Sequence, residues 1–263
     1  MTVVGRVDSL WRYPVKSMRG EPLAEAFAGF AGVYGDRVYA FRSDAAPKGF
    51  PYLTGREQPL LLRCRPSYRH AAPMRLPSNL AEAEALGIGV TPLYAEQADL
   101  SVDVELPSGE SLTIDDPRLI DLLRPAGRDG AAVTLLRSER ALTDCRPISL
   151  ISVQTVRQLG EDLGHGLDPR RFRANLDIDL DANVAFGEDG WVGRRLGIGD
   201  RTQLLILARD SRCKMITIDP ETAEANPGVM RCLARDHEGT AGVYAAVLVE
   251  GAMRAGDALT LLD

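Results

Sequence analysis

The 263-residue chain has few of the residues that build metal clusters or disulfide frameworks. It contains four cysteines and three histidines. No two cysteines form a C-x-x-C pair, which argues against a zinc ribbon or a cysteine-ligated iron–sulfur cluster. The histidines are scattered, without a second ligand at metal spacing. The cysteines are therefore expected to be free thiols.

Long apolar runs and an excess of positive charge are also missing. No apolar run approaches the roughly 20 residues of a membrane span, so we expect no membrane association. The net charge of −6 does not support nucleic-acid binding, although a local basic pocket for a small anion stays compatible with it. Residues 1–6 lack the order of a signal peptide, and we expect a cytoplasmic protein.

The chain is rich in turn residues, with 25 glycines and 16 prolines. Between them stand short β-branched and aromatic runs, which is a strand-and-turn pattern. The sequence predicts a mainly β fold with a few helices and closed or nearly closed barrels. Gly-Asp precedes three expected strands, at residues 35, 199 and 256, where a positive φ would let the sheet curl. The Pro/Gly-rich residues 125–130 are the expected boundary between two halves.

Individual elements follow from periodicity and punctuation. We expect strands at 4–13, 23–30, 37–41, 60–64, 133–136, 176–180, 203–208, 215–218, 242–249 and 256–261, a hairpin over 100–114, and helices at 79–86, 117–123, 153–163 and 229–235. In the strand at 176–180, the alternating acidic positions are expected to face water. Residues 78–98 are interpreted as an insertion.

Three local patterns are candidates for chemistry. Lys16, Ser17 and Arg19 share one loop and suit a phosphate, although cations in turns are commonly just solvated. Cys213 stands between Arg212 and Lys214, and nearby cations favour a thiolate that acts as a nucleophile or metal ligand. The alternative for Cys213 is a small buried hydrophobic side chain.

Ser152 precedes a helical pattern at residues 153–163. It suits either a plain N-cap or an anion site at the helix N-terminus.

Four motifs in order resemble the MOSC family: residues 10–17, Gly35-Asp36-Arg37, Phe172-Arg173-Ala174-Asn175, and 211–220. They are most similar to its branch related to the amidoxime-reducing components. The resemblance implies a MOSC N-terminal β-barrel domain over residues 2–125 and a MOSC domain over 130–262.

The resemblance also implies a molybdenum–molybdopterin cofactor, with Cys213 as the metal ligand and catalytic residue. Lys16, Ser17, Arg37 and Arg173 would bind the anionic pterin. The remaining candidates at matching motif positions are Ser152, Asn175, Ser211 and Arg212. Ala174 departs from the proline that the family usually has there.

Two functions remain open on this resemblance. One is a molybdenum-dependent oxidoreductase that reduces small N-hydroxylated or N-oxidised substrates, with Asp210 or Asp219 assisting proton delivery. No pyridoxal-phosphate cofactor is expected in this chain. Because no iron–sulfur cluster is expected either, its electrons would come from a separate ferredoxin-like or cytochrome/flavin-reductase-like protein. The other is a non-catalytic protein that binds, sulfurates or delivers the cofactor.

Overall fold

Strands dominate the fold, as the sequence predicts. The computed structural model describes the chain except for residues 47–48, 70–75, 78, 86–99, 125–130 and 139. The described strands are β1 (Thr2–Arg12), β2 (Glu21–Leu23), β3 (Glu25–Gly29), β4 (Gly32–Val33), β5 (Tyr39–Ser43), β6 (Arg65–Tyr68), β7 (Val102–Glu105), β8 (Ser111–Thr113), β9 (Val133–Arg137), β10 (Ile148–Ser152), β11 (Leu176–Leu180), β12 (Arg195–Ile198), β13 (Thr202–Ser211), β14 (Thr240–Val249), β15 (Gly251–Arg254) and β16 (Ala258–Leu261).

The helices are short and lie mostly outside the sheets. They are α1 (Leu60–Arg63), α2 (Leu80–Glu84), α3 (Pro117–Leu122), α4 (Val153–Leu163) and α5 (Pro227–Asp236). Three 3₁₀ helices span Pro169–Phe172, Gly187–Trp191 and Lys214–Thr217.

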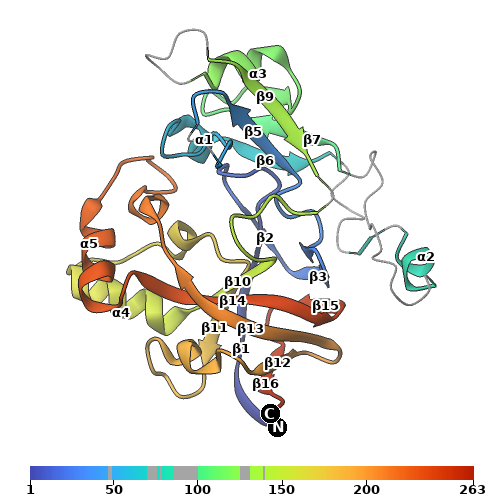
Figure 1. The fold of residues 1–263 in the computed structure, drawn as a ribbon, viewed down its shortest axis with the longest axis vertical. Coiled ribbons are helices and arrows are strands. Elements are labelled where there is room, and N and C mark those ends of the chain that lie inside the picture. The colour runs from blue at the N-terminus through green and yellow to red at the C-terminus, as the bar shows by residue number, and fades with distance from the viewer. Residues whose placement is uncertain (47–48, 70–75, 78, 86–99, 125–130, 139) are drawn as a thin grey trace.

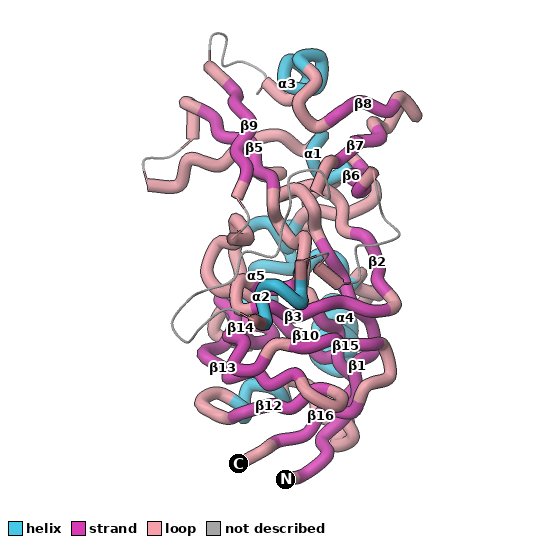
Figure 2. Tube along the Cα trace, turned by 90° about the vertical axis from the view of Figure 1, so that its right-hand side faces the viewer, coloured by secondary structure: helices cyan, strands magenta, loops and turns pink. Residues whose placement is uncertain are grey.

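A seven-stranded barrel forms the lower part of the molecule (Figure 1). Its strands pair in the order β11, β10, β14, β13, β12, β16 and β1, and the pairing of β1 with β11 closes the ring. The pairs are antiparallel except β10 with β11, which run parallel. Thr2 lies opposite Leu261, so the two ends of the chain are neighbours (Figures 1 and 2).

Side chains point alternately inward and outward along the barrel strands, and the inward ones fill the barrel. The interior is a buried apolar cluster to which β1 contributes Val7 and Leu10, β10 contributes Ile148 and Leu150, and β13 contributes Leu204 and Ile206. All three Gly-Asp glycines have positive φ, 78° at Gly35, 56° at Gly199 and 90° at Gly256, which confirms the predicted kinks.

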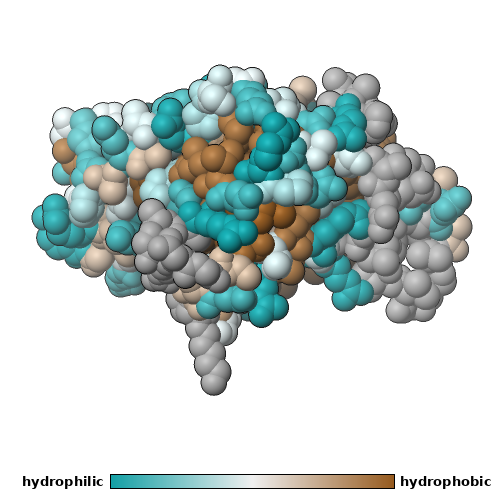
Figure 3. Space-filling view, turned by 90° about the horizontal axis from the view of Figure 1, so that it is seen from above, coloured by the Kyte–Doolittle hydropathy of each residue, from teal (hydrophilic) through white to brown (hydrophobic). Residues whose placement is uncertain are grey.

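Smaller sheets form the upper part of the molecule. β5 pairs with β9, β6 to β8 form a second sheet, and a separate apolar cluster packs beneath them with α1 and α3. Seen from above, hydrophobic surface gathers near the centre with hydrophilic residues around it (Figure 3). β3 pairs with β15 from the other end of the chain. Strand pairing thus joins the first half of the sequence to the second through β1, β3 and β5.

Two predicted strands are helical in the structure. Residues 60–63 form α1 because Pro59 adopts helical angles (φ −60°, ψ −21°) and Leu61 and Leu62 both point into the core. Residues 214–217 form a 3₁₀ helix, in which Thr217 Oγ1 donates to the Lys214 carbonyl (2.8 Å). A short apolar run does not distinguish a strand from a helical turn.

Of the two acidic positions of β11, Asp179 is partly exposed and pairs with Arg6, but Asp177 does not face water as predicted. Asp177 is only 5% exposed. Ser9 Oγ (2.8 Å) and Trp11 Nε1 (3.1 Å) donate to its Oδ2 across the β1–β11 pair. Hydrogen bonds from a neighbouring strand, which sequence alternation does not reveal, make this burial possible.

Other local predictions are confirmed. The hairpin at 100–114 consists of β7 and β8, and Asp116 caps α3 by accepting from the Arg118 backbone N–H (2.8 Å). The expected boundary at 125–130 and most of the expected insertion at 78–98 lie outside the described residues.

Candidate functional site

A cavity of about 600 Å³ opens at the end of the barrel where β10 and β11 begin and β13 ends. Loops from the upper part complete its wall. The lining residues are Lys16, Ser17, Arg37, Phe50, Thr54, Arg56, Thr143, Asp144, Cys145, Arg146, Ser149, Arg171, Phe172, Arg173, Asn175, Ala208, Arg209, Asp210, Ser211, Arg212, Cys213, Met215, Ile216 and Tyr244.

The cavity is strongly basic in an acidic protein. Eight of its lining residues are Lys or Arg, and two, Asp144 and Asp210, are acidic. The whole chain carries a net charge of −6. Cations concentrated around a cleft focus the field on it, so the site suits an anionic ligand.

Tyr13 holds two of the cavity arginines in place. Its ring is 2% exposed, and the guanidinium carbons of Arg37 and Arg173 lie 4.7 and 4.3 Å from its centroid. Arg37 Nη2 also donates to the Arg173 carbonyl (2.9 Å), and Arg173 Nη1 donates to the Met18 carbonyl (2.7 Å). The two cations are therefore fixed side by side before any ligand binds.

Burial affects the charge state of these two arginines differently. It lowers the pKa of Arg173 to about 10, with Arg37 as a further lowering influence. For Arg37, burial acts in the same direction, but the ion pair with Asp36 outweighs it and raises the pKa. Both side chains remain cations at neutral pH.

Lys16 is nearly buried beside them, with 5% of its surface exposed. Its Nζ donates to the Leu142 carbonyl (2.8 Å), pairs with Asp144 and lies 4.6 Å from the Tyr52 ring centroid. Burial lowers the pKa of Lys16, and the Asp144 carboxylate opposes that shift.

Backbone strain is concentrated in this wall of the cavity. Among the described residues, seven other than glycine have positive φ, and three of them are Ser17 (67°), Arg37 (48°) and Arg173 (53°). All three line the cavity and all three are predicted ligands of the cofactor. Such conformations cost about 1–3 kcal/mol each and cluster at ligand sites.

The end of β13 carries the cysteine. Cys213 is exposed, lines the cavity and forms the N-cap of the 3₁₀ helix Lys214–Thr217. Ser211 lies beside it in the lining. The Arg212 side chain hydrogen-bonds to the backbone. Its Nε donates to the Ala241 carbonyl (2.8 Å) and its Nη1 donates to the Phe172 carbonyl (2.7 Å).

Asp210 and Asp219, the two candidates for proton delivery, have different environments. Asp210 lines the cavity, accepts from Ser149 Oγ (2.8 Å) and from Tyr244, and pairs with Arg212 (2.9 Å). Burial raises the pKa of Asp210 despite Arg212.

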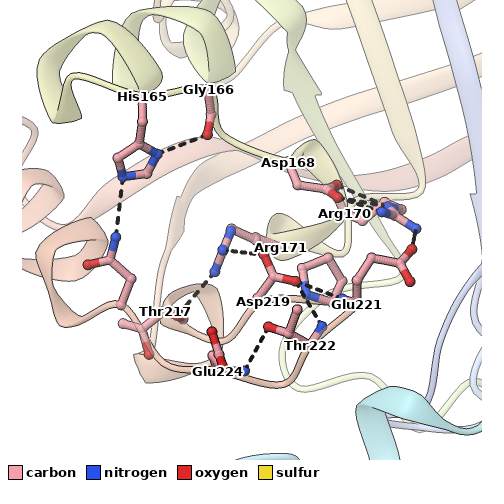
Figure 4. A network of polar contacts seen from close by, with 12 residues as sticks. His165, Gly166, Asp168, Arg170, Arg171, Thr217, Asp219, Glu221, Thr222 and Glu224 are labelled. Carbon is pink, nitrogen blue, oxygen red and sulfur yellow. Dashed lines mark hydrogen bonds and ion pairs between the residues drawn. The ribbon is translucent and has the colours of Figure 1, made fainter. Parts of the chain in front are cut away.

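Asp219 does not line the cavity and is committed to a turn. It accepts from the backbone N–H groups of Glu221 (2.9 Å) and Thr222 (3.0 Å) and pairs with Arg171 (2.6 Å), as Figure 4 shows. Although burial acts to raise its pKa, these backbone hydrogen bonds and Arg171 lower it.

Asn175 lines the cavity but also joins strands. Its Oδ1 accepts from the Ser149 backbone N–H (3.3 Å), and its Nδ2 donates to the Trp11 carbonyl (3.3 Å). Its side chain therefore fixes the relative positions of β1 and β10 at the cavity floor.

Ser152, alone among the predicted ligands, does not line the cavity. It is fully buried and caps α4, accepting from the Thr155 backbone N–H (3.0 Å). The Glu188 carboxylate accepts from the Ser152 N–H (3.0 Å) and from Thr155 Oγ1 (2.9 Å). The helix N-terminus that suits an anion is thus occupied by the protein's own carboxylate.

Several lining residues are absent from the prediction. Cys145 is exposed and follows Asp144, the partner of Lys16. Arg56, Arg146 and Tyr244 also line the cavity. The sequence of segment 143–147 could have indicated Cys145 and Arg146, since it places an acid, a thiol and a cation together. Arg56 and Tyr244 reach the cavity only through the tertiary fold.

The donor set fits a phosphate-bearing ligand better than a bare metal ion. Within the described residues, no group of three or more His, Cys, Asp and Glu could hold a metal, so a metal at Cys213 needs further ligands from a cofactor. Among the same residues, Arg173 Nη2 and Arg171 Nε are buried without a hydrogen-bond partner, which leaves donors for an anion.

Comparisons with known proteins agree with this architecture. Residues 4–116 match the MOSC N-terminal beta barrel domain and residues 137–260 match the MOSC domain. The chain belongs to the MOSC family.

Three individual proteins are similar to the chain, with sequence identities between 12% and 40%. The chain is 27% identical over 237 residues to mitochondrial amidoxime-reducing component 1 of Mus musculus, covering 83% of this chain and 67% of that protein. It is 40% identical over 79 residues to molybdenum cofactor sulfurase of Danio rerio, covering 29% of this chain but 9% of that protein. The crystal structure of YUAD from Bacillus subtilis overlaps 97% of this chain and 94% of its own, with a TM-score of 0.49 and 12% identity.

The helices give no sign of a membrane span. In the part of the chain that the structure describes, none is long and apolar enough to cross a bilayer.

Proposed function

We propose that the cavity binds a molybdenum–molybdopterin cofactor and that the protein reduces small N-hydroxylated or N-oxidised compounds with it. The observation that carries the proposal is that Ser17, Arg37 and Arg173, all in strained left-handed conformations, line one basic cavity with an exposed Cys213. The relation to an amidoxime-reducing component favours this substrate class.

In this proposal the deep cations bind the phosphate and the β13 end binds the metal. Lys16, Ser17, Arg37 and Arg173 donate to the phosphate, and Arg212, Ser211 and Asn175 shape the wall beside it. Cys213 ligates the metal through its thiolate. A bound molybdenum cofactor supplies a two-electron redox centre for removing oxygen from the substrate.

Asp210 is the proposed proton source. It lines the cavity, burial raises its pKa, and Tyr244 and Ser149 orient its carboxyl group. Asp219 is the weaker candidate because it pairs with Arg171 within a turn. Electrons would come from a separate ferredoxin-like or cytochrome/flavin-reductase-like protein, and the cytoplasmic location expected from the sequence remains part of the proposal.

Metal analysis tests the cofactor assignment. Protein from a molybdopterin-competent host should contain close to one molybdenum per chain, and Cys213→Ala should abolish it because the thiolate ligand is lost. Cys145→Ala is the matched control, since it removes another exposed thiol of the same cavity. Wild-type protein without molybdenum, or equal loss in both variants, contradicts the assignment.

The alternative function is storage, sulfuration or delivery of the cofactor, which the similarity to a cofactor sulfurase favours. An assay of the molybdenum-loaded protein with reduced viologen and an N-hydroxylated amidine separates the two. Turnover selects the oxidoreductase; full molybdenum occupancy without turnover selects the carrier.

A further inference from the structure

Arg56 is a cavity cation that the proposed cofactor-binding set does not use. Its side chain is 28% exposed, against 6% for Lys16 and 7% for Arg212, so it lies nearer to solvent. Nε donates to Thr54 Oγ1 (3.1 Å) and lies 3.8 Å from Glu57. Among the described residues, neither terminal nitrogen of Arg56 has a hydrogen-bond partner, which leaves its planar fork free for a ligand.

Aromatic side chains orient that fork. The guanidinium carbon of Arg56 lies 5.4 Å from the Phe50 ring centroid. Phe50 meets Tyr52 edge to face, with centroids 5.2 Å apart and planes at 82°. Tyr52 in turn lies under Lys16. Lys16 Nζ also lies 5.7 Å from the Phe50 ring centroid, so Phe50, which lines the cavity, is a fixed aromatic group between two cations.

The loop that carries Arg56 is packed against the segment that follows Cys213. A Cβ on Gly55 would lie 2.9 Å from Leu62 Cδ1 and 3.3 Å from Met215 Cε. The loop is therefore held between α1 and the 3₁₀ helix whose N-cap is Cys213. Arg56 and Cys213 both line the cavity.

We propose that Phe50 and Arg56 form a substrate subsite that selects planar compounds bearing a carboxylate or similar anionic substituent. The inference rests on the proposed function, because it takes Cys213 as the position of the reacting centre. A planar substrate packs against Phe50 with its N-hydroxylated end toward Cys213, and its anionic end pairs with the Arg56 fork. Neutral substrates of the same shape lack the second contact.

Direct binding tests this selectivity without requiring turnover. The probes are benzamidoxime and its 4-carboxylate, titrated calorimetrically into molybdenum-loaded protein. We expect the carboxylate to bind roughly tenfold more tightly to wild type, as for a charge-assisted pair at a partly exposed site. In Arg56→Gln the ratio of the two dissociation constants should fall to about one. Arg56→Lys, a second variant, keeps the charge without the fork and should give an intermediate ratio.

Arg63→Gln is the matched control, because Arg63 is an exposed arginine of the neighbouring α1 that does not line the cavity. It should retain the wild-type ratio. Equal binding of both probes to wild type, or an unchanged ratio in both Arg56 variants, overturns the subsite. Loss of molybdenum or pterin from Arg56→Gln also overturns it, since Arg56 would then serve the cofactor. Absence of turnover contradicts only the oxidoreductase proposal.

Discussion

At the scale of single residues, buried charge is arranged in two different ways in this protein. Around the cavity, Tyr13 and backbone carbonyls hold cations that keep donors available. In β11, by contrast, Asp177 is enclosed by neutral donors alone, Ser9 and Trp11. The first arrangement favours a ligand, whereas the second makes a carboxylate costly to ionise.

That cost predicts how stability depends on pH. Burial raises the pKa of Asp177 from 3.8 to about 6, against the opposing hydrogen bonds from Ser9 and Trp11. Well below pH 3.8 the group is protonated in both states. As pH rises from about 4 to 6 the unfolded state ionises first, so folding loses up to roughly 3 kcal/mol of stability.

Asp177→Asn should remove this loss. Between pH 4 and 7.5 the unfolding free energy of wild type should therefore fall by roughly 2 kcal/mol relative to that of the variant. Urea unfolding at both pH values measures the difference, and Asp200→Asn, at an exposed turn position, is the control. Parallel pH profiles for wild type and Asp177→Asn would refute the prediction.

At the scale of elements, α4 shows how the fold closes a candidate anion site. Ser152 caps the helix from within the protein, and Glu188 occupies its N-terminus. Ser152→Ala should thus cost about 1 kcal/mol of stability, as loss of an N-cap does, and leave the molybdenum content of loaded protein at the wild-type level.

Urea unfolding and metal analysis of the same preparations check both parts of the Ser152 prediction. Ser108→Ala, in the exposed β7–β8 turn, should change neither quantity. A drop in molybdenum content for Ser152→Ala that exceeds its effect on folding would instead assign Ser152 to the cofactor.

Elements with a strong local signal were predictable from sequence, and those set by tertiary contacts were not. The predicted helix that starts at Pro117 and the predicted cap of α4 at Ser152 depend on local sequence, and both are confirmed. Residues 60–63 were misassigned because Pro59 and two buried leucines decide their conformation. In the cavity, the motif residues were predictable from family resemblance, whereas Arg56 and Tyr244 carry no local signal and meet only through the fold.

At the scale of the whole molecule, the barrel draws its strands from both ends of the chain. β1 separates β11 from β16 in the ring, and β3 pairs with β15. Residues 130–263 alone would therefore lack one barrel strand and expose two unpaired edges. We expect that fragment to remain unfolded.

Adding residues 1–33 to the C-terminal end of this fragment, through a short linker after Asp263, should restore folding. The linker can be short because Thr2 and Leu261 are already neighbours. We call this rearranged fragment the permutant. Near-ultraviolet circular dichroism and urea unfolding compare the fragment with the permutant. A cooperative transition in the fragment itself would contradict the need for β1.

Closure of the barrel by β1 also determines how late in synthesis the fold can be completed. The first strand leaves the ribosome early, but its partner β16 follows some 250 positions later, and such distant pairings form slowly. Until β16 is made, one edge of β1 has no partner strand. Unpaired edges of this kind make incomplete chains prone to associate with one another. The residues that line the cavity run from Lys16 to Tyr244, so the site that Asn175 ties to Trp11 takes its ligand only after most of the chain has been made.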